Sequence, residues 1–156
     1  MIKETLYTLE GIYREDFKIT GFRFGHGEKA ACVVGSLRGN EYQQTYICSQ
    51  LIKELKKLEE HGQIAVGKEI MVIPCLNHYA TNIDRRFWPL DDSDLNRRFP
   101  GMANGDTTQQ IASEIMESIK GYDYGIQLTS FYMPGKFVPH VRMMETGLQN
   151  PSLANL

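Results

Sequence analysis

Two short apolar runs separated by a long amphipathic stretch constrain the fold of this chain more than any other feature. Residues 30–35 and 69–75 are apolar enough for strands that are buried on both faces of a sheet. Between them, residues 41–60 place apolar side chains on one side of a helix and charged side chains on the other. Asn40 can cap this helix, and Gly62 can end it. This order predicts a βαβ unit, and therefore an α/β fold. The apolar positions of the helix are Ile47, Leu51, Leu55 and Leu58.

The remaining segments extend this unit to a mixed, mostly parallel sheet flanked by helices. A second amphipathic helix is predicted over 107–120, capped by Asp106 and ended by Gly121. The polar stretch 76–104 has no clean period but carries aromatic residues, so we expect an ordered functional loop. The 156 residues, 42% of them apolar, suffice for one core, which predicts a single domain over 1–156. Further strands are predicted at 4–9, 17–24, 123–129 and 137–144.

Charge and cysteine content exclude several classes of protein. The 17 Lys and Arg oppose 19 Asp and Glu, which disfavours binding to a nucleic-acid backbone. Basic and aromatic residues alternate at 85–88 and 97–99, but the neighbouring aspartates argue against a single-strand surface. No apolar run reaches the roughly 18–20 residues of a membrane span, and the first residues lack a signal-peptide pattern. Three scattered cysteines indicate reduced thiols, so we expect a cytoplasmic protein.

Three polar segments follow predicted strands, which is where open α/β sheets bind their ligands. They are GSLRGNE at 35–41, the segment from RRFWP at 85–89 to DLNRRFPG at 94–101, and GIQLT at 125–129. Because these segments follow different strands, their common position is stronger evidence for a site than any one of them alone.

These segments resemble the succinylglutamate desuccinylase/aspartoacylase family, a branch of the zinc carboxypeptidase superfamily, over about residues 25–145. DLNRRFPG at 94–101 is the most specific element. GSLRGNE resembles the family's GGxHGNE segment, residues 127–129 correspond to an Asp-Leu-His motif, and PHV at 139–141 also fits. The resemblance implies a mixed α/β sheet between helices, and hydrolysis of the amide of an N-acyl amino acid. It also implies a zinc ion held by two His and one Glu.

The zinc-ligand positions implied by the resemblance are only partly filled. Glu41 matches the carboxylate ligand, whereas Arg38 and Thr129 stand at the two His positions. Gln127 replaces the Asp beside the second His. Arginine has no lone pair to donate, and a threonine hydroxyl is a weak neutral ligand. We therefore expect zinc to be the family's cofactor but absent from this chain, with Arg38 paired to Glu41 in place of the metal charge. The spare histidines near this end of the sheet are His78 and His140.

The positions that the resemblance assigns to the substrate are better preserved. Asn96 and Arg97 match the pair that grips the substrate carboxylate. Arg86, with Arg85 as the alternative, matches the catalytic arginine that polarises the scissile carbonyl. A planar guanidinium suits bidentate binding of a carboxylate. The expected partner is therefore a small carboxylate-bearing amino-acid derivative, with no nucleic acid and no membrane.

Three functions stay open. The first is a deacylase or carboxypeptidase-like hydrolase completed by sequence beyond residue 156, where the family's general-base Glu lies. The second is a pseudoenzyme or binding module that keeps Asn96 and Arg97 without the metal chemistry. The third is a truncated chain completed by self-association, since family members are about twice this length; a homodimer would then bury 137–144, Leu153 and Leu156. The residues favour the second function for this chain, and the resemblance favours the first.

Overall fold

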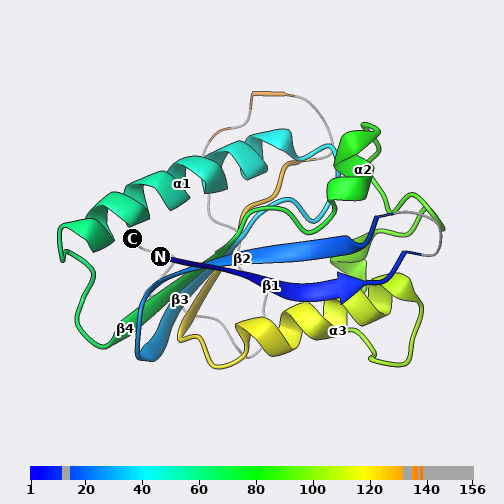
Figure 1. Ribbon diagram of the computed structural model, residues 1–156. Helices are drawn as coiled ribbons and strands as arrows, with labels where there is room; N and C mark the ends of the chain where they lie inside the picture. The colour runs from blue at the N-terminus through cyan, green and yellow to red at the C-terminus, as the bar shows by residue number, and fades with distance from the viewer. Residues whose placement is uncertain (12–14, 132–134, 137, 139–156) are drawn as a thin grey trace.

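Five strands form one mixed sheet that lies between two layers of helix (Figure 1). The structure is a computed structural model that describes residues 1–11, 15–131, 135, 136 and 138. The sheet order is β1-β2-β4-β3-β5. β1 pairs with β2 and β2 with β4 in antiparallel ladders, whereas β3 pairs with β4 and β5 in parallel ladders. The strands are β1 (Ile2–Leu9), β2 (Phe17–Gly25), β3 (Glu28–Val34), β4 (Lys68–Ile73) and β5 (Tyr124–Gln127).

This topology confirms the predicted mixed α/β sheet and its βαβ unit. The apolar runs at 30–35 and 69–75 correspond to β3 and β4, which are adjacent and parallel as a βαβ crossover requires. The predictions at 4–9, 17–24 and 123–129 correspond to β1, β2 and β5. The strand predicted at 137–144 and the PHV segment lie outside the described residues, except for Val138, which is in no strand.

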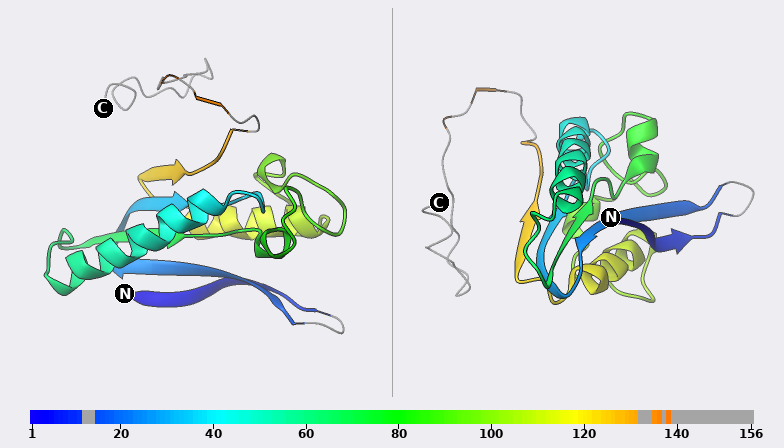
Figure 2. Two further views of the ribbon diagram at one scale, coloured as in Figure 1. Left: turned by 90° about the horizontal axis from the view of Figure 1, so that it is seen from above. Right: turned by 60° about the vertical axis from the view of Figure 1, so that its left-hand side comes forward.

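The helix α1 (Tyr42–Glu60) covers one face of the sheet, and α3 (Thr107–Ile119) covers the other (Figures 1 and 2). At the start of α3, the Asp106 side chain accepts the Gln109 backbone amide, and the Gln109 side chain accepts the Asp106 backbone amide. The predicted cap is therefore present as a capping box. The prediction for α1 was partly wrong. Its buried row is Gln44, Cys48 and Leu55, whereas Ile47 and Leu58 are exposed.

The start of α1 also differs from the prediction. Asn40 does not cap the helix: Glu41 is the N-cap residue, and no side chain caps the helix there. The Glu41 carboxylate is instead held by residues beyond the helix, as described below. The far end is as predicted, since the helix ends at His61 and Gly62 follows with a positive φ of 65°.

Two apolar clusters, one on each face, hold the sheet to its helices. Alternate residues of the central strands point to opposite faces, so that Val33 and Val72 pack with Cys48 of α1. Cys32 and Ile73 pack in the cluster on the α3 face. All three cysteines are free, and burial raises the pKa of the Cys48 thiol to about 11. A buried thiol with a raised pKa is unreactive.

The stretch 76–104 is ordered, as predicted, although it contains helical turns that its sequence did not indicate. These are α2 (His78–Asn82) and the 3-10 turn η1 (Leu95–Arg97). Leu76, Trp88 and Leu95 from this stretch are buried in the core cluster on the α3 face. This anchoring fixes η1 close to the ends of the parallel strands. Within the described part of the chain, no helix is long and apolar enough to cross a membrane.

Candidate functional site

Three segments meet at the carboxyl ends of the parallel strands and form a polar cleft. They are the loop 35–41 after β3, the η1 turn and the residues that follow β5. The Leu128 amide donates to the Val34 carbonyl oxygen at 2.8 Å, which continues the β3–β5 ladder to the edge of the cleft. The cleft has a volume of about 750 Å³. Its lining residues are Arg38, Arg86, Phe87, Asp92, Asp94, Asn96, Arg97, Thr129, Ser130 and Phe131.

The buried carboxylate of Glu41 joins the loop after β3 to the end of β5. Oε1 accepts a hydrogen bond from Thr129 Oγ1 at 2.7 Å and another from the Ser130 amide at 3.2 Å. Oε2 accepts from the backbone amide of Arg38 at 3.2 Å. Buried carboxylates require such partners, and here they come from two segments that are about 90 residues apart in sequence. Glu41 is therefore firmly positioned by the protein itself.

The guanidinium of Arg38 lies between two carboxylates. Its Nη1 is 3.5 Å from Glu41 Oε1, so the pairing predicted from the sequence is present. The stronger partner is Asp94: Nη2 lies 3.0 Å from Oδ2, and Nε lies 3.2 Å from Oδ1. Nη1 also donates to Thr129 Oγ1 at 3.3 Å. All three nitrogens of the guanidinium therefore contact protein oxygens.

The predicted ligand-binding residues face the same cleft. Arg97 is 82% exposed, and its only ion pair among the described residues is an Nε contact of 3.5 Å with Asp94. Asn96 accepts a hydrogen bond from Gln127 Nε2 at 2.8 Å through Oδ1, which leaves its own amide group free to donate. Arg86 lines the cleft and lies over the Phe87 ring at 5.7 Å, whereas Arg85 is exposed and does not line it.

The positions that hold zinc in the family offer one good zinc donor here. The structure brings Arg38, Glu41 and Thr129 together, as the resemblance implied. Of the three, only Glu41 carries a carboxylate, and its oxygens are already engaged. Among the described residues, no group of three or more His, Cys, Asp or Glu side chains is placed to hold a metal ion. The donor set therefore does not match the three N, O or S ligands of a catalytic zinc.

The described histidines lie away from the cleft. His78 stacks on Phe17 at a centroid distance of 4.4 Å, and burial lowers its pKa. His26 lies in the turn between β2 and β3, as predicted, and His61 lies at the end of α1. His140 is outside the described residues.

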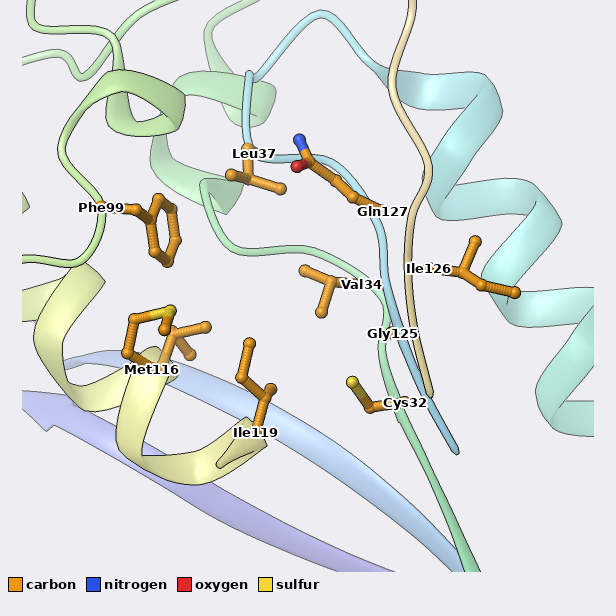
Figure 3. Close-up of a pocket in the computed structure, with 10 residues that line it drawn as sticks. Cys32, Val34, Leu37, Phe99, Met116, Ile119, Gly125, Ile126 and Gln127 are labelled. Carbon is orange, nitrogen blue, oxygen red and sulfur yellow. The ribbon is translucent and has the colours of Figure 1, made fainter. Parts of the chain in front are cut away.

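A second hollow has a volume of about 300 Å³ and a largely apolar lining (Figure 3). It lies between α3 and the strands β3 and β5. Cys32 and Val34 line it from β3, and Met116 and Ile119 line it from α3. Gln127 also lines this hollow and is hydrogen-bonded to Asn96, so this one side chain connects the apolar hollow to the polar cleft.

Two contacts of this site were not foreseen from the sequence. One is the bidentate contact of Asp94 with Arg38, and the other is the hydrogen bond between Gln127 and Asn96. Asp94 carried a local signal, because an Asp before Leu-Asn-Arg is a typical cap, and it does accept from the Asn96 amide. No pattern in the sequence pointed to either side-chain pairing.

Comparison of this arrangement with solved structures gives the fold class first. A metallo-carboxypeptidase from Pseudomonas aeruginosa superposes with a TM-score of 0.59, over 80% of this chain and 34% of that protein. At 16% identity this likeness shows the fold alone, which is carboxypeptidase-like. The family follows from the sequence match: a model of the succinylglutamate desuccinylase/aspartoacylase catalytic domain matches residues 28–128. The chain therefore belongs to this family.

Two relatives show how much of such a protein the chain represents. An aspartoacylase family protein from Mesorhizobium loti has 29% identity and a TM-score of 0.65, over 78% of this chain and 38% of that one. The N-alpha-acetyl-L-2,4-diaminobutyric acid deacetylase of Halomonas elongata is 30% identical over 94 residues, which are 60% of this chain and 25% of the enzyme. The chain thus spans well under half the length of these relatives.

Proposed function

We propose that this chain binds a small carboxylate-bearing amino-acid derivative in the polar cleft, without zinc at the Arg38, Glu41 and Thr129 positions. One observation carries the proposal. The Arg38 guanidinium pairs with Glu41 and Asp94, while Arg97 and Asn96 keep donors free toward the same cleft. The cationic charge that a metal would supply is thus present as a side chain.

The free donors in the cleft suit a carboxylate. Among the described residues, Arg97 contacts Asp94 through Nε only, so its Nη groups can form the parallel pair of hydrogen bonds that a carboxylate accepts. The amide group of Asn96 adds a further donor beside it. Arg86 also lines the cleft and is available to the carbonyl oxygen of an N-acyl group. The two arginines would therefore contact the two ends of an N-acyl amino acid.

In this proposal the chain is a pseudoenzyme, that is, a binding module that binds its ligand without hydrolysing it. Its free cysteines, two of them buried, agree with a cytoplasmic setting, which we propose as its location. Amide hydrolysis is the second candidate function, because the chain belongs to a deacylase family and is 30% identical to a diaminobutyric acid deacetylase over 94 residues. Hydrolysis would need a metal ion with further ligands besides Glu41, and a general base.

Calorimetry with N-acetyl amino acids and their primary amides tests the binding proposal. We expect the wild type to bind the carboxylate form and to bind the amide form at least about tenfold more weakly, since charge-assisted hydrogen bonds are lost. Arg97→Ala should remove this preference. Arg85→Ala is the matched control, because Arg85 is the exposed arginine beside Arg86 and does not line the cleft. An equal loss of the preference for the carboxylate form in R97A and R85A would contradict the proposal.

Metal analysis separates the two candidate functions. We expect no stoichiometric zinc in the purified wild type, no change in Tm on adding zinc or a chelator, and no hydrolysis of N-acetyl amino acids. The double variant R38H/T129H places two imidazoles beside Glu41 and should bind zinc, with about 2.7 kcal/mol of stabilisation at a zinc concentration 100 times its Kd. One zinc per wild-type chain, lost in Glu41→Gln, would favour the enzyme instead.

A further inference from the structure

We infer that Arg38 is a positioning residue for the ligand: it neutralises Asp94 and thereby keeps Arg97 available to a carboxylate in the cleft. The inference rests on the proposed function, because it concerns the same cleft. It assigns Arg38 a role in ligand binding that acts through its contacts with Asp94.

Four charged groups form a continuous row from the buried end of the site to its mouth. Glu41 contacts Arg38, Arg38 contacts Asp94, and Asp94 contacts Arg97. The contacts of Asp94 with Arg38 are bidentate and as short as 3.0 Å, whereas its contact with Arg97 is a single one of 3.5 Å. Asp94 therefore gives most of its interaction to Arg38 and little to Arg97.

Burial explains why the Asp94 carboxylate needs a cation paired with it. Its side chain is 12% exposed, and that of Arg38 is 10% exposed. A carboxylate buried to this extent needs a paired charge, because removing one partner leaves an uncompensated charge away from water. Glu41 depends less on Arg38, because Thr129 and Ser130 already donate hydrogen bonds to its carboxylate. Without Arg38, the described cation left beside Asp94 is Arg97.

The geometry also prevents Asp94 from moving out of the way. Its Oδ1 accepts the Asn96 backbone amide at 3.1 Å and so caps the η1 turn that carries both Asn96 and Arg97. Asp94 is thus fixed next to the residues that meet the ligand. If its charge were not held by Arg38, it would draw the Arg97 guanidinium inward and compete with the ligand carboxylate for it.

Binding of an N-acetyl amino acid to four proteins tests this inference. Arg38→Met should lower the affinity about tenfold, the cost of diverting one charge-assisted contact. Adding Asp94→Asn should restore the affinity to within about threefold of the wild type, because the competing charge is gone while the amide oxygen still caps η1. Asp94→Asn alone should raise the affinity, because Arg97 then has no carboxylate beside it that competes with the ligand. A loss in R38M that Asp94→Asn does not restore would overturn the inference and indicate a merely structural role.

Chemical labelling of Arg97 gives a second readout that needs no ligand. Phenylglyoxal modifies accessible guanidinium groups, and mass spectrometry locates the modified residue. We expect Arg97 to be labelled readily in the wild type, slowly in R38M, and readily again in R38M/D94N. If the wild type binds no carboxylate but this labelling pattern holds, the proposed function fails and the charge row stands. Unchanged labelling in folded R38M would overturn the inference. If R38M does not fold, Arg38→Lys replaces it, and its single ammonium contact should slow labelling partially.

Discussion

At the scale of single residues, Gln127 decides which end of the Asn96 amide faces the cleft. Gln127 donates through Nε2 to Asn96 Oδ1, so the end of the Asn96 side chain that is left for a ligand is its NH₂ group, a donor. An Asp at position 127, as in the family motif, could only accept, and it would turn the Asn96 oxygen toward the cleft. The replacement that removes an acidic residue from the metal motif therefore also favours binding of an anion.

Gln127→Met removes this hydrogen bond at nearly constant volume. We expect the affinity for an N-acetyl amino acid to fall about two- to fivefold, which corresponds to a hydrogen bond at the lower end of the usual range. In an Asn96→Ala background the same substitution should have no further effect, because Gln127 acts through Asn96. Equal losses in both backgrounds, measured by calorimetry, would contradict this role.

His78 predicts a pH dependence of stability that is independent of the cleft. Burial against Phe17 lowers the pKa of His78 below its usual 6.5, so the folded protein holds this proton less well than the unfolded chain. The unfolded state then binds more protons, and the free energy of unfolding falls as the pH drops below about 6.5. Urea denaturation at pH 7 and pH 5 should show a smaller loss in His78→Phe than in the wild type. An identical loss of stability in both proteins would exclude His78 as the source of the pH dependence.

At the scale of elements, the loop between β3 and α1 depends on close backbone approach. Gly39 packs against α2 and the residues after it, and a Cβ there would lie 2.3 Å from the Arg85 carbonyl oxygen and 2.4 Å from the Ala80 carbonyl carbon. Because both atoms are backbone, the loop itself must move, and Arg38 and Glu41 would move with it.

Gly39→Ala should destabilise the protein by about 1–3 kcal/mol, the usual cost of overpacking, and should weaken carboxylate binding as well. Gly125→Ala is the matched control. Its added Cβ would meet only Cys32 Sγ at 3.6 Å, an ordinary contact, so we expect a change within about 0.5 kcal/mol. Urea denaturation compares the two variants. If G125A lost as much free energy of unfolding as G39A, close packing of the β3–α1 loop would not be the cause of the destabilisation in G39A.

The elements with strong periodicity were predictable from the sequence, and those held by tertiary contacts were not. β3, β4 and α3 follow from apolar spacing that the core enforces, and α1 was predicted as a helix although the face that it buries differs from the predicted one. The short α2 and η1 turns have too few residues to be stable alone, and they exist because Trp88 and Leu95 beside them are buried. The site divides in the same way. Arg38 and Glu41 are three residues apart, so their pairing could be predicted, whereas Asp94 is brought to Arg38 from 56 residues away by the fold.

At the scale of the whole molecule, the two edges of the sheet differ in their protection. β1 forms one edge and carries Lys3 and Glu4, charges that discourage association with another strand. Within the part of the chain that the structure describes, β5 forms the other edge of the sheet, and all four of its residues are exposed. Residues 124–131 contain no charged side chain. The apolar hollow between α3 and β5 borders this edge.

We propose that a second copy of the chain pairs with the β5 edge, in the isologous arrangement that a two-fold axis gives. Burial of apolar surface there would contribute roughly 25 cal/mol per Å² before the cost of association. The predicted burial of 137–144, Leu153 and Leu156 in such a dimer lies outside the described residues.

Ile126→Lys tests this pairing because it places a charge in the middle of the β5 edge. We expect sedimentation velocity at micromolar concentrations to show a dimer for the wild type and a monomer for I126K. Ile2→Lys is the matched control: Ile2 is 60% exposed on β1, close to the 56% of Ile126, but lies on the opposite edge of the sheet. I2K should remain dimeric, since that edge already carries charges. The pairing would be contradicted if the wild type were monomeric at all concentrations. It would also be contradicted if I2K and I126K disrupted the dimer equally.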